Sequence, residues 1–162
     1  MRQSICKIAK EVFDIASLKK TVIASAESCT GGMLSSAITD IPGSSAIFEC
    51  GFVTYSNISK MKFLNVNQIT LESFGAVSEE VAAEMAIGAL KNSKADIAIA
   101  ITGIAGPGCS NTKPEGMVCF SVAFEKGIKL NKTKQFGPLG RAIVREKATI
   151  YGLNLLKSAL SK

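Results

Sequence analysis

The sequence predicts a single α/β domain over residues 1–162, a three-layer α/β/α sandwich around a mixed, mostly parallel sheet. Two observations predict this class. Short apolar segments alternate with segments whose apolar residues recur at helical spacing, which is the order of a layered α/β protein. Late in the chain, only Glu125-Lys-Gly separates two strand-like segments, so a hairpin should add an antiparallel pair to the sheet. The length suits one compact domain.

The first quarter of the chain predicts a helix, a strand, a turn and a second helix. Residues 3–18 place isoleucine, valine and phenylalanine at helical intervals among charged residues. Residues 21–27 then predict a short strand. Thr30-Gly-Gly follows as a turn, and residues 33–39 predict a helix that ends before Ile41-Pro-Gly.

The next segment predicts a second strand and a short helix. Residues 45–55 are rich in apolar and aromatic side chains, and Gly51 among them indicates a bulge or a close backbone approach. Residues 57–64 predict a short helix, with Asn57 or Ser59 near its N-terminal cap.

The second half predicts the centre of the sheet and the closing hairpin. Ser78 should cap a helix that carries two glutamates in its first turn, where they favour the helix dipole. Residues 95–102 are apolar at nearly every position, as in a central strand that is buried on both faces. The hairpin strands are residues 117–124 and 128–135, and residues 141–160 predict a closing helix.

Composition restricts the chemistry. The chain contains no histidine, which excludes Ser-His-Asp and Cys-His activation of a nucleophile and removes the commonest transition-metal ligand. A hydrolase would need Lys, Tyr, Asp or Glu as its general base. The 5 cysteines are odd in number and none lie at CxxC spacing, which argues against a disulfide framework and a structural zinc site. We therefore expect no metal and no cofactor.

The net charge of +6 is concentrated after residue 125. A basic end attracts phosphate-bearing ligands or nucleic acid, although a solvated lysine face is the simpler interpretation. No set of aromatic side chains suited to stacking on bases interleaves with these basic residues, which argues against nucleic acid as a partner. The chain shows neither a run of eighteen apolar residues nor the apolar core of a signal peptide, so we expect a cytoplasmic protein without a membrane partner.

Three segments at strand ends carry small and polar residues that suit a binding site. They are Glu27-Ser-Cys-Thr-Gly-Gly, residues 54–60, and residues 102–108. In α/β sheets, ligands bind beyond the carboxyl ends of the strands. If the three strands are neighbours, these segments should converge on one pocket.

Each segment has a chemical and a purely structural interpretation. The first places Ser28 before a helix whose free N–H groups could receive an anion, but strand-turn-helix junctions of this kind are common. A partly desolvated Lys60 could lose its proton and activate a serine, or it could be an ordinary exposed lysine. The third segment suits an oxyanion or phosphate cradle, or a tight turn without a ligand. It contains neither a Walker sequence nor a GxGxxG fingerprint.

Together these motifs resemble the CinA C-terminal domain family. The resemblance rests on Glu27-Ser-Cys-Thr-Gly-Gly, on Val53-Thr-Tyr-Ser-Asn with Lys60 five residues after Tyr55, and on Thr102-Gly-Ile-Ala-Gly-Pro, and it extends over residues 5–160. Active members of that family are nicotinamide-nucleotide amidases. The resemblance implies hydrolysis of nicotinamide mononucleotide, a small pyridine nucleotide, to nicotinic acid mononucleotide and ammonia.

The resemblance also implies roles for individual residues. Ser28 would be the nucleophile and Lys60 its base, with Tyr55 assisting. Cys29 is a competing nucleophile by sequence alone, and the resemblance makes it structural. The positions expected to hold the substrate or the oxyanion are Thr30, Gly31, Gly32, Asn57, Thr102, Gly103, Ala105, Gly106, Arg141 and Arg145.

Two departures from the family pattern concern the substrate site. Gly108 is followed by Cys109, where the family often has further glycine. Leu139-Gly precedes Arg141, where the family usually has an acidic residue directly before the arginine. A non-catalytic nucleotide-binding or competence-related regulatory domain is the alternative function. The resemblance also implies a homo-oligomer.

Overall fold

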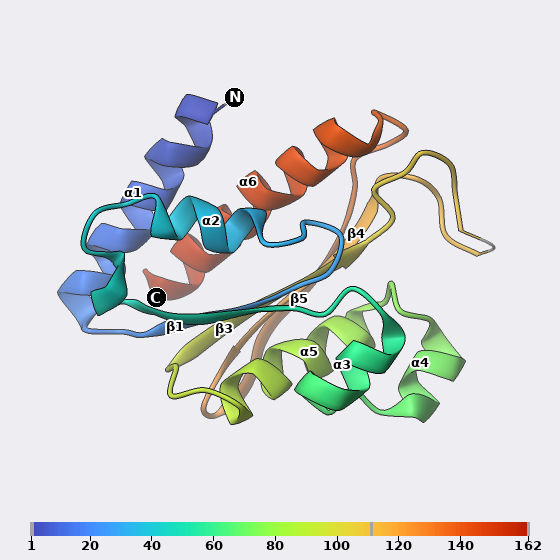
Figure 1. Cartoon of the computed structure of the whole chain (residues 1–162), viewed down its shortest axis with the longest axis horizontal. Helices are drawn as coiled ribbons and strands as arrows, with labels where there is room; N and C mark the ends of the chain where they lie inside the picture. The colour runs from blue at the N-terminus through green and yellow to red at the C-terminus, as the bar shows by residue number, and fades with distance from the viewer. Residues whose placement is uncertain (1, 111, 162) are drawn as a thin grey trace.

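The computed structural model describes residues 2–110 and 112–161 and shows a five-stranded sheet between two helical layers (Figure 1). The strands lie in the order β2-β1-β3-β4-β5. β1 is parallel to both of its neighbours, and β4 is antiparallel to both of its neighbours, so every strand except β4 runs in one direction. Their bounds are β1 Ile23–Glu27, β2 Phe48–Val53, β3 Ile97–Gly103, β4 Met117–Phe124 and β5 Gly127–Gln135.

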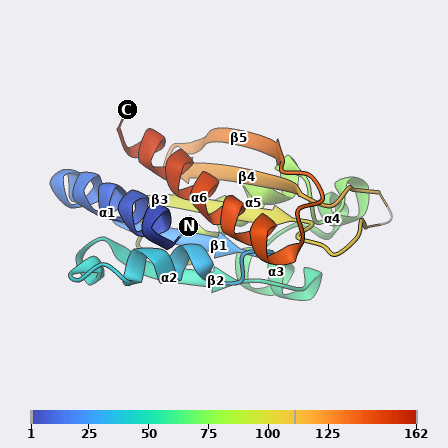
Figure 2. The ribbon, with the colours of Figure 1, turned by 90° about the horizontal axis from the view of Figure 1, so that it is seen from above.

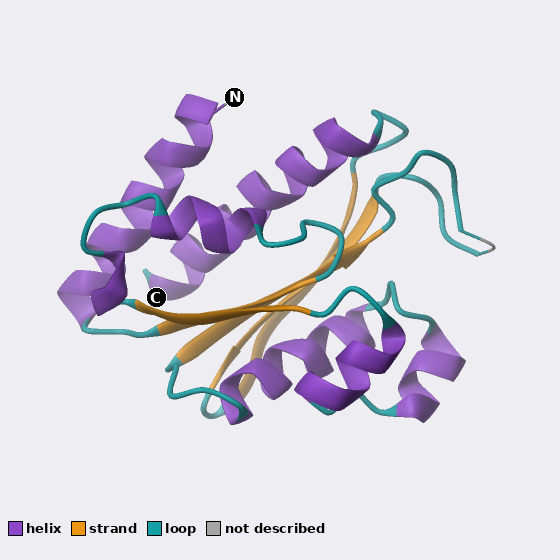
Figure 3. Cartoon of the chain, in the orientation of Figure 1, coloured by secondary structure: helices purple, strands orange, loops and turns teal. Residues whose placement is uncertain are grey.

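Helices cover both faces of this sheet, which confirms the predicted three-layer class (Figure 3). α1 (Arg2–Lys19), α2 (Met33–Thr39) and α6 (Arg141–Leu160) lie together on one face, as the view from above shows (Figure 2). The other face carries α3 (Asn57–Leu64), α4 (Gln68–Phe74) and α5 (Glu79–Lys91). Among the helices described, none is long and apolar enough to cross a membrane.

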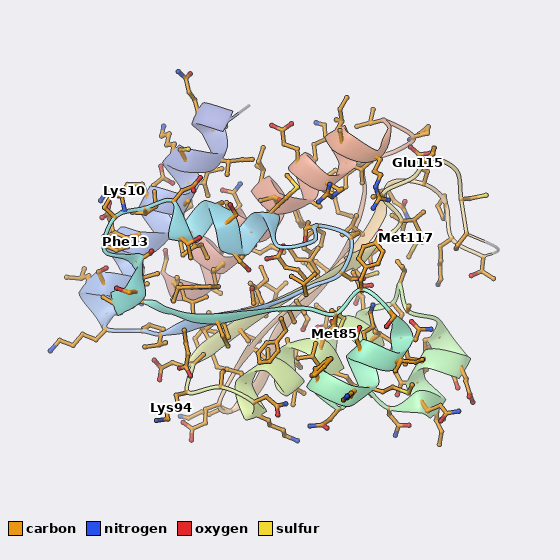
Figure 4. All side chains as sticks on the ribbon, in the orientation of Figure 1. Lys10, Phe13, Met85, Lys94, Glu115 and Met117 are labelled. Carbon is orange, nitrogen blue, oxygen red and sulfur yellow. The ribbon has the colours of Figure 1, made fainter. Side chains whose placement is uncertain are left out.

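The central strand β3 separates two hydrophobic cores. Its isoleucines, at positions 97, 99 and 101, pack into the core beneath α1, α2 and α6. Its alanines, at positions 98 and 100, face α5 and contribute to the second core, where Met85 of α5 fills the space that they leave (Figure 4). The strand is buried from Ile97 to Thr102, as the run of apolar residues predicts.

Several details differ from the sequence prediction. α4 was not predicted, because it contributes only Leu71 to the core and so has no apolar stripe of helical length. The second strand is shorter than residues 45–55, because a 3-10 turn at Ser44–Ala46 takes up its expected beginning.

The residue that caps α3 is also different. The cap is Ser56 rather than Asn57 or Ser59. Ser56 and Ser59 form a capping box: the Ser59 amide donates to the Ser56 hydroxyl, and the Ser56 amide donates to the Ser59 hydroxyl, both at 3.1 Å. Gly51 marks a close approach rather than a bulge, since a Cβ there would lie 2.4 Å from Ser35 Oγ. The irregular register of β2 lies at the start of the strand instead.

Candidate active site

The carboxyl ends of β1, β2 and β3 bring the three polar segments together. Glu27, the last residue of β1, pairs with Val53 of β2 on one side and with Ile101 of β3 on the other. The segments that follow these strands therefore meet at one edge of the sheet, as predicted. They enclose a pocket of about 230 Å³ lined by Ser28, Cys29, Tyr55, Asn57, Lys60, Ala76, Val77, Thr102, Gly103, Ile104, Ala105 and Arg141.

A larger hollow of about 510 Å³ lies at the β4–β5 turn, lined by Asp96 and residues 124–129. It is an open surface beside an exposed hairpin and includes neither Ser28 nor Lys60. Of these two hollows, the smaller one places a serine hydroxyl beside a buried titratable side chain, so we take it as the candidate site.

Ser28 and Lys60 form a buried pair at the base of the pocket. The Ser28 amide donates to the Ile101 carbonyl at 2.9 Å, which fixes the residue directly after β1. Lys60 Nζ lies 3.0 Å from Ser28 Oγ and donates to the Thr54 carbonyl at 2.8 Å. The capping box at Ser56 fixes the start of α3, and Lys60 follows in the first turn of that helix.

Lys60 is 1% exposed. The side-chain ion pairs among the described residues are Lys10–Asp14 and Lys157–Glu11, so no carboxylate neutralises Lys60 there. Burial lowers the pKa of Lys60 to about 8, and the neighbouring Cys29 raises it by a smaller amount. A considerable fraction of the side chain is therefore a neutral amine slightly above neutral pH, as a general base requires.

Cys29 also lines the pocket but is poorly suited to nucleophilic attack. Burial raises the pKa of its thiol to about 12, so the thiolate is scarce at neutral pH. The competition between the two neighbouring nucleophile candidates therefore favours Ser28.

Tyr55 and Arg141 lie at the rim of the pocket. The Tyr55 side chain is 59% exposed, and its hydroxyl accepts from Arg141 Nη2 at 2.6 Å. Tyr55 meets Lys60 through its main-chain carbonyl, at 3.5 Å, and not through its hydroxyl. Arg141 Nη1 donates to the Gly106 carbonyl at 3.1 Å. Asn57 completes this side of the pocket from the start of α3.

Arg145 holds the loop that follows Ser28. Its Nε donates to the Cys29 carbonyl at 3.0 Å and its Nη2 to the Thr30 carbonyl at 2.9 Å. A Cβ at Gly31 would lie 3.1 Å from Arg145 Nη2, so the glycine lets the guanidinium approach closely. Arg145 is not among the residues that line the pocket, and its guanidinium contacts the backbone of the two residues after Ser28.

The amino end of α2 is occupied by the protein's own carboxylate. Glu27, which is 1% exposed, accepts from the amides of Gly32, Leu34 and Ser35 at 2.8–3.1 Å and from Ser35 Oγ at 2.6 Å. The amides that the sequence offered to an anion are therefore already paired. Thr30, Gly31 and Gly32 shape this turn and are not among the residues that line the pocket.

The segment after β3 forms the opposite wall. Thr102 Oγ1 donates to the Ala76 carbonyl at 2.7 Å, which ties the end of β3 to the loop before α5. Gly103 and Ala105 line the pocket directly. Within the described part of the chain, the amides of Cys29 and Ala105 donate to no backbone oxygen of another residue, and both residues line the pocket.

Sequence reasoning missed the roles of two glutamates. Glu27 caps α2 from inside the fold, and its signal was an acidic residue at the end of a fully buried strand. Glu115 touches both the loop after β3 and the start of α6, and its local sequence carries no signal of this. No cluster of three or more potential metal ligands occurs among the residues that the structure describes.

Comparisons with known proteins complete the description. The sequence model of the CinA C-terminal domain family matches residues 5–160 of this chain. The nicotinamide-nucleotide amidohydrolase PncC of Escherichia coli K12 is 46% identical over 153 residues, which are 94% of this chain and 92% of that protein. A protein of the same name from Enterobacter agglomerans is 51% identical over 129 residues, or 79% of this chain and 78% of its own length. The crystal structure of the competence/damage inducible protein CihA from Agrobacterium tumefaciens has a TM-score of 0.93 and 40% identity, covering 98% of this chain and 96% of that one.

Proposed function

The chain belongs to the CinA C-terminal domain family, and we propose that it hydrolyses nicotinamide mononucleotide to nicotinic acid mononucleotide and ammonia. The observation that carries this proposal is the buried contact of 3.0 Å between Lys60 Nζ and Ser28 Oγ, in a pocket where burial lowers the pKa of the lysine. The names of the two amidohydrolase relatives supply the substrate class.

The first half of the reaction acylates the serine. Neutral Lys60 accepts the hydroxyl proton of Ser28 while Oγ attacks the carboxamide carbon, and the carbonyl oxygen becomes an oxyanion. In this proposal the main-chain amides of Cys29 and Ala105, two residues that line the pocket, donate to that oxyanion. Lys60 then gives its proton to the departing nitrogen, ammonia leaves, and an ester joins the pyridine carbonyl to Ser28. The cationic pyridinium withdraws electrons from the carboxamide and favours the attack.

The second half returns the enzyme to its starting state. Water takes the place of ammonia and transfers a proton to Lys60 as its oxygen attacks the ester carbon. The second tetrahedral intermediate collapses, Lys60 returns the proton to Ser28 Oγ, and the carboxylic acid leaves. The Thr54 carbonyl keeps the amine directed at Ser28 throughout, because it accepts a hydrogen bond from Lys60 at 2.8 Å.

The rim of the pocket suits the nucleotide part of the substrate. Arg141 is exposed there, and its two contacts with Gly106 and Tyr55 leave N–H groups free for a phosphate. Asn57 stands on the same side. In this proposal Tyr55 assists by holding Arg141 with its hydroxyl and Lys60 with its carbonyl, and Arg145 keeps the nucleophile in place.

The test is ammonia release from nicotinamide mononucleotide with EDTA present. The wild type should turn over, whereas Ser28→Ala and Lys60→Met should lose activity by about 10³-fold or more. Ser36→Ala and Lys62→Met are matched controls, because both side chains are exposed on the helices that carry or follow the two reacting groups. Both controls should keep wild-type activity.

The pH dependence provides a second criterion. The value of kcat/KM should rise with pH to a plateau above about 8, because Lys60 must lose its proton before it can accept one from Ser28. A folded wild type that binds the nucleotide without releasing ammonia would refute the amidase and favour a nucleotide-binding regulatory domain.

A further inference from the structure

Glu115 stands where three segments of the chain meet. It lies two residues before β4, at the end of the loop that follows β3, and its side chain reaches the loop and the start of α6 (Figure 4). The base of this loop is closed by two main-chain hydrogen bonds, from the Ile104 amide to the Met117 carbonyl and from the Gly116 amide to the Ile104 carbonyl. Glu115 therefore projects from a fixed point next to the pocket wall.

Both carboxylate oxygens of Glu115 are used. Oε2 accepts from the Gly108 amide at 2.7 Å, and Oε1 accepts from the Gly140 amide at 3.0 Å. The carboxyl group also packs directly on Gly106, where a Cβ would lie 2.4 Å from its carboxyl carbon. Gly106 has φ of +84°, which favours glycine. Its lack of a side chain also leaves the space that the carboxylate occupies.

These contacts surround Arg141 without touching its guanidinium. Gly140 is the N-cap of α6 and directly precedes Arg141, and no side chain of its own caps the helix. Gly106 supplies the carbonyl that accepts from Arg141 Nη1. In the described part of the chain, no ion pair joins Glu115 to Arg141. Glu115 thus holds the backbone on which Arg141 begins and the loop to which its guanidinium binds.

A carboxylate at this point also suits the helix. The amino end of α6 carries partial positive charge, and an acidic group stabilises it. The residues directly before Arg141 are Leu139 and Gly140, so the chain provides no acid locally. Glu115, which lies 25 positions earlier in the chain, brings a carboxylate to the Gly140 amide instead.

We propose that Glu115 is a positioning residue that fixes Arg141 over the substrate pocket by joining the 106–108 loop to the start of α6. The substrate in this inference is the one named under the proposed function, on which the inference rests. Glu115 acts through the backbone and Arg141. Its loss should therefore weaken substrate binding while leaving the reaction at Ser28 intact.

Steady-state kinetics of Glu115→Gln test the proposal. The glutamine keeps the size of the side chain, but its amide group faces one of the two N–H donors and cannot accept from it. KM for nicotinamide mononucleotide should rise about tenfold, with kcat within about twofold of the wild type. Glu125→Gln is the matched control, because Glu125 is exposed in the β4–β5 turn, and its KM should not change. An unchanged KM in Glu115→Gln would overturn the proposal.

A double-mutant cycle separates positioning from general weakening. In an Arg141→Ala background, Glu115→Gln should change KM by less than about twofold, since there is no guanidinium left to position. A further tenfold rise in that background would refute the action through Arg141. Thermal unfolding checks that each variant is folded. If Glu115→Gln does not fold, Glu115→Asp keeps the charge on a shorter side chain and should show the same rise in KM.

A crystal structure of Glu115→Gln keeps the inference separate from the amidase proposal. It should show Arg141 released from the Gly106 carbonyl and from the Tyr55 hydroxyl. If the wild type failed to turn over the nucleotide, the amidase proposal would fall while this structure still decided the role of Glu115. An Arg141 side chain that stayed in place would overturn the positioning role even if the wild type were fully active.

Discussion

The buried Lys60 should make the stability of the fold depend on pH, and Lys60→Met isolates this effect. Burial lowers the pKa of the lysine from its usual 10.5 to about 8. The difference between these values corresponds to about 3 kcal/mol at pH well below 8, because the folded state must hold a desolvated ammonium there. Methionine has a similar length and carries no charge.

The direction of the effect follows from proton binding. Between about pH 8 and 10.5 the unfolded chain keeps a proton on Lys60, whereas the folded chain has released it. The unfolded state then holds more protons, so the free energy of unfolding rises with pH across this window. The contribution amounts to about 1 kcal/mol between pH 7 and pH 9. Cys29 acts oppositely above its usual 9.0, because burial raises the pKa of its thiol to about 12.

Urea unfolding at pH 7, 8 and 9 measures the difference between wild type and Lys60→Met. The comparison removes the contribution of Cys29, which both proteins contain, and the wild type should gain about 1 kcal/mol relative to the variant by pH 9. The absolute difference at pH 7 is less informative, because the variant also leaves the Thr54 carbonyl without its donor, at about 1–3 kcal/mol. Lys62→Met, at an exposed position, should follow the wild type. Parallel pH dependences in wild type and Lys60→Met would refute a lowered pKa and with it Lys60 as the base.

Three further substitutions test the structure around the site. Glu27→Gln should lower the free energy of unfolding in urea by about 2–3 kcal/mol, because a neutral amide cannot accept from all the donors of α2; a change below about 0.5 kcal/mol would contradict this. Gly88→Ala should lower the free energy of unfolding by about 3 kcal/mol or more in the same assay, since the alanine Cβ would lie 1.9 Å from the Leu64 carbonyl oxygen. A gain in stability would show that α3 and α5 separate easily. Arg145→Lys should lower kcat about tenfold with little change in KM, because an ammonium cannot bridge two carbonyls as the guanidinium does; the opposite pattern would place Arg145 at the substrate.

The sequence predicts those parts of the fold that depend on local pattern. The central strand β3 and the hairpin of β4 and β5 are correctly predicted. A strand buried on both faces needs a continuous run of apolar residues, and a tight hairpin needs a short turn sequence between two strands, so both features can be seen in the sequence. α4 has no such mark, since its seven residues bury only Leu71. The sequence predicts the cap of α3 at Asn57 or Ser59 rather than at Ser56, because the capping box uses Ser59 where glutamate or glutamine is usual.

The candidate site depends more on tertiary structure. Ser28 and Lys60 are 32 residues apart and meet only because β2 lies beside β1 in the sheet. No local pattern distinguishes the two arginines of α6. Arg141 lies at the rim of the pocket, whereas Arg145, one helical turn further along, contacts the backbone of Cys29. The sheet order decides the first outcome, and the way α6 packs on the sheet decides the second.

The lysines of β5 have a consequence for how the molecule behaves in a concentrated solution. β5 is an edge strand, and Lys129, Lys132 and Lys134 project from it. An unpaired strand edge is a template on which another chain can extend the sheet and start a fibre. A second copy that docked its own β5 there would bring like charges together across the ladder, which is unfavourable. The three lysines of β5 therefore disfavour extension of the sheet by the β5 edge of a second molecule.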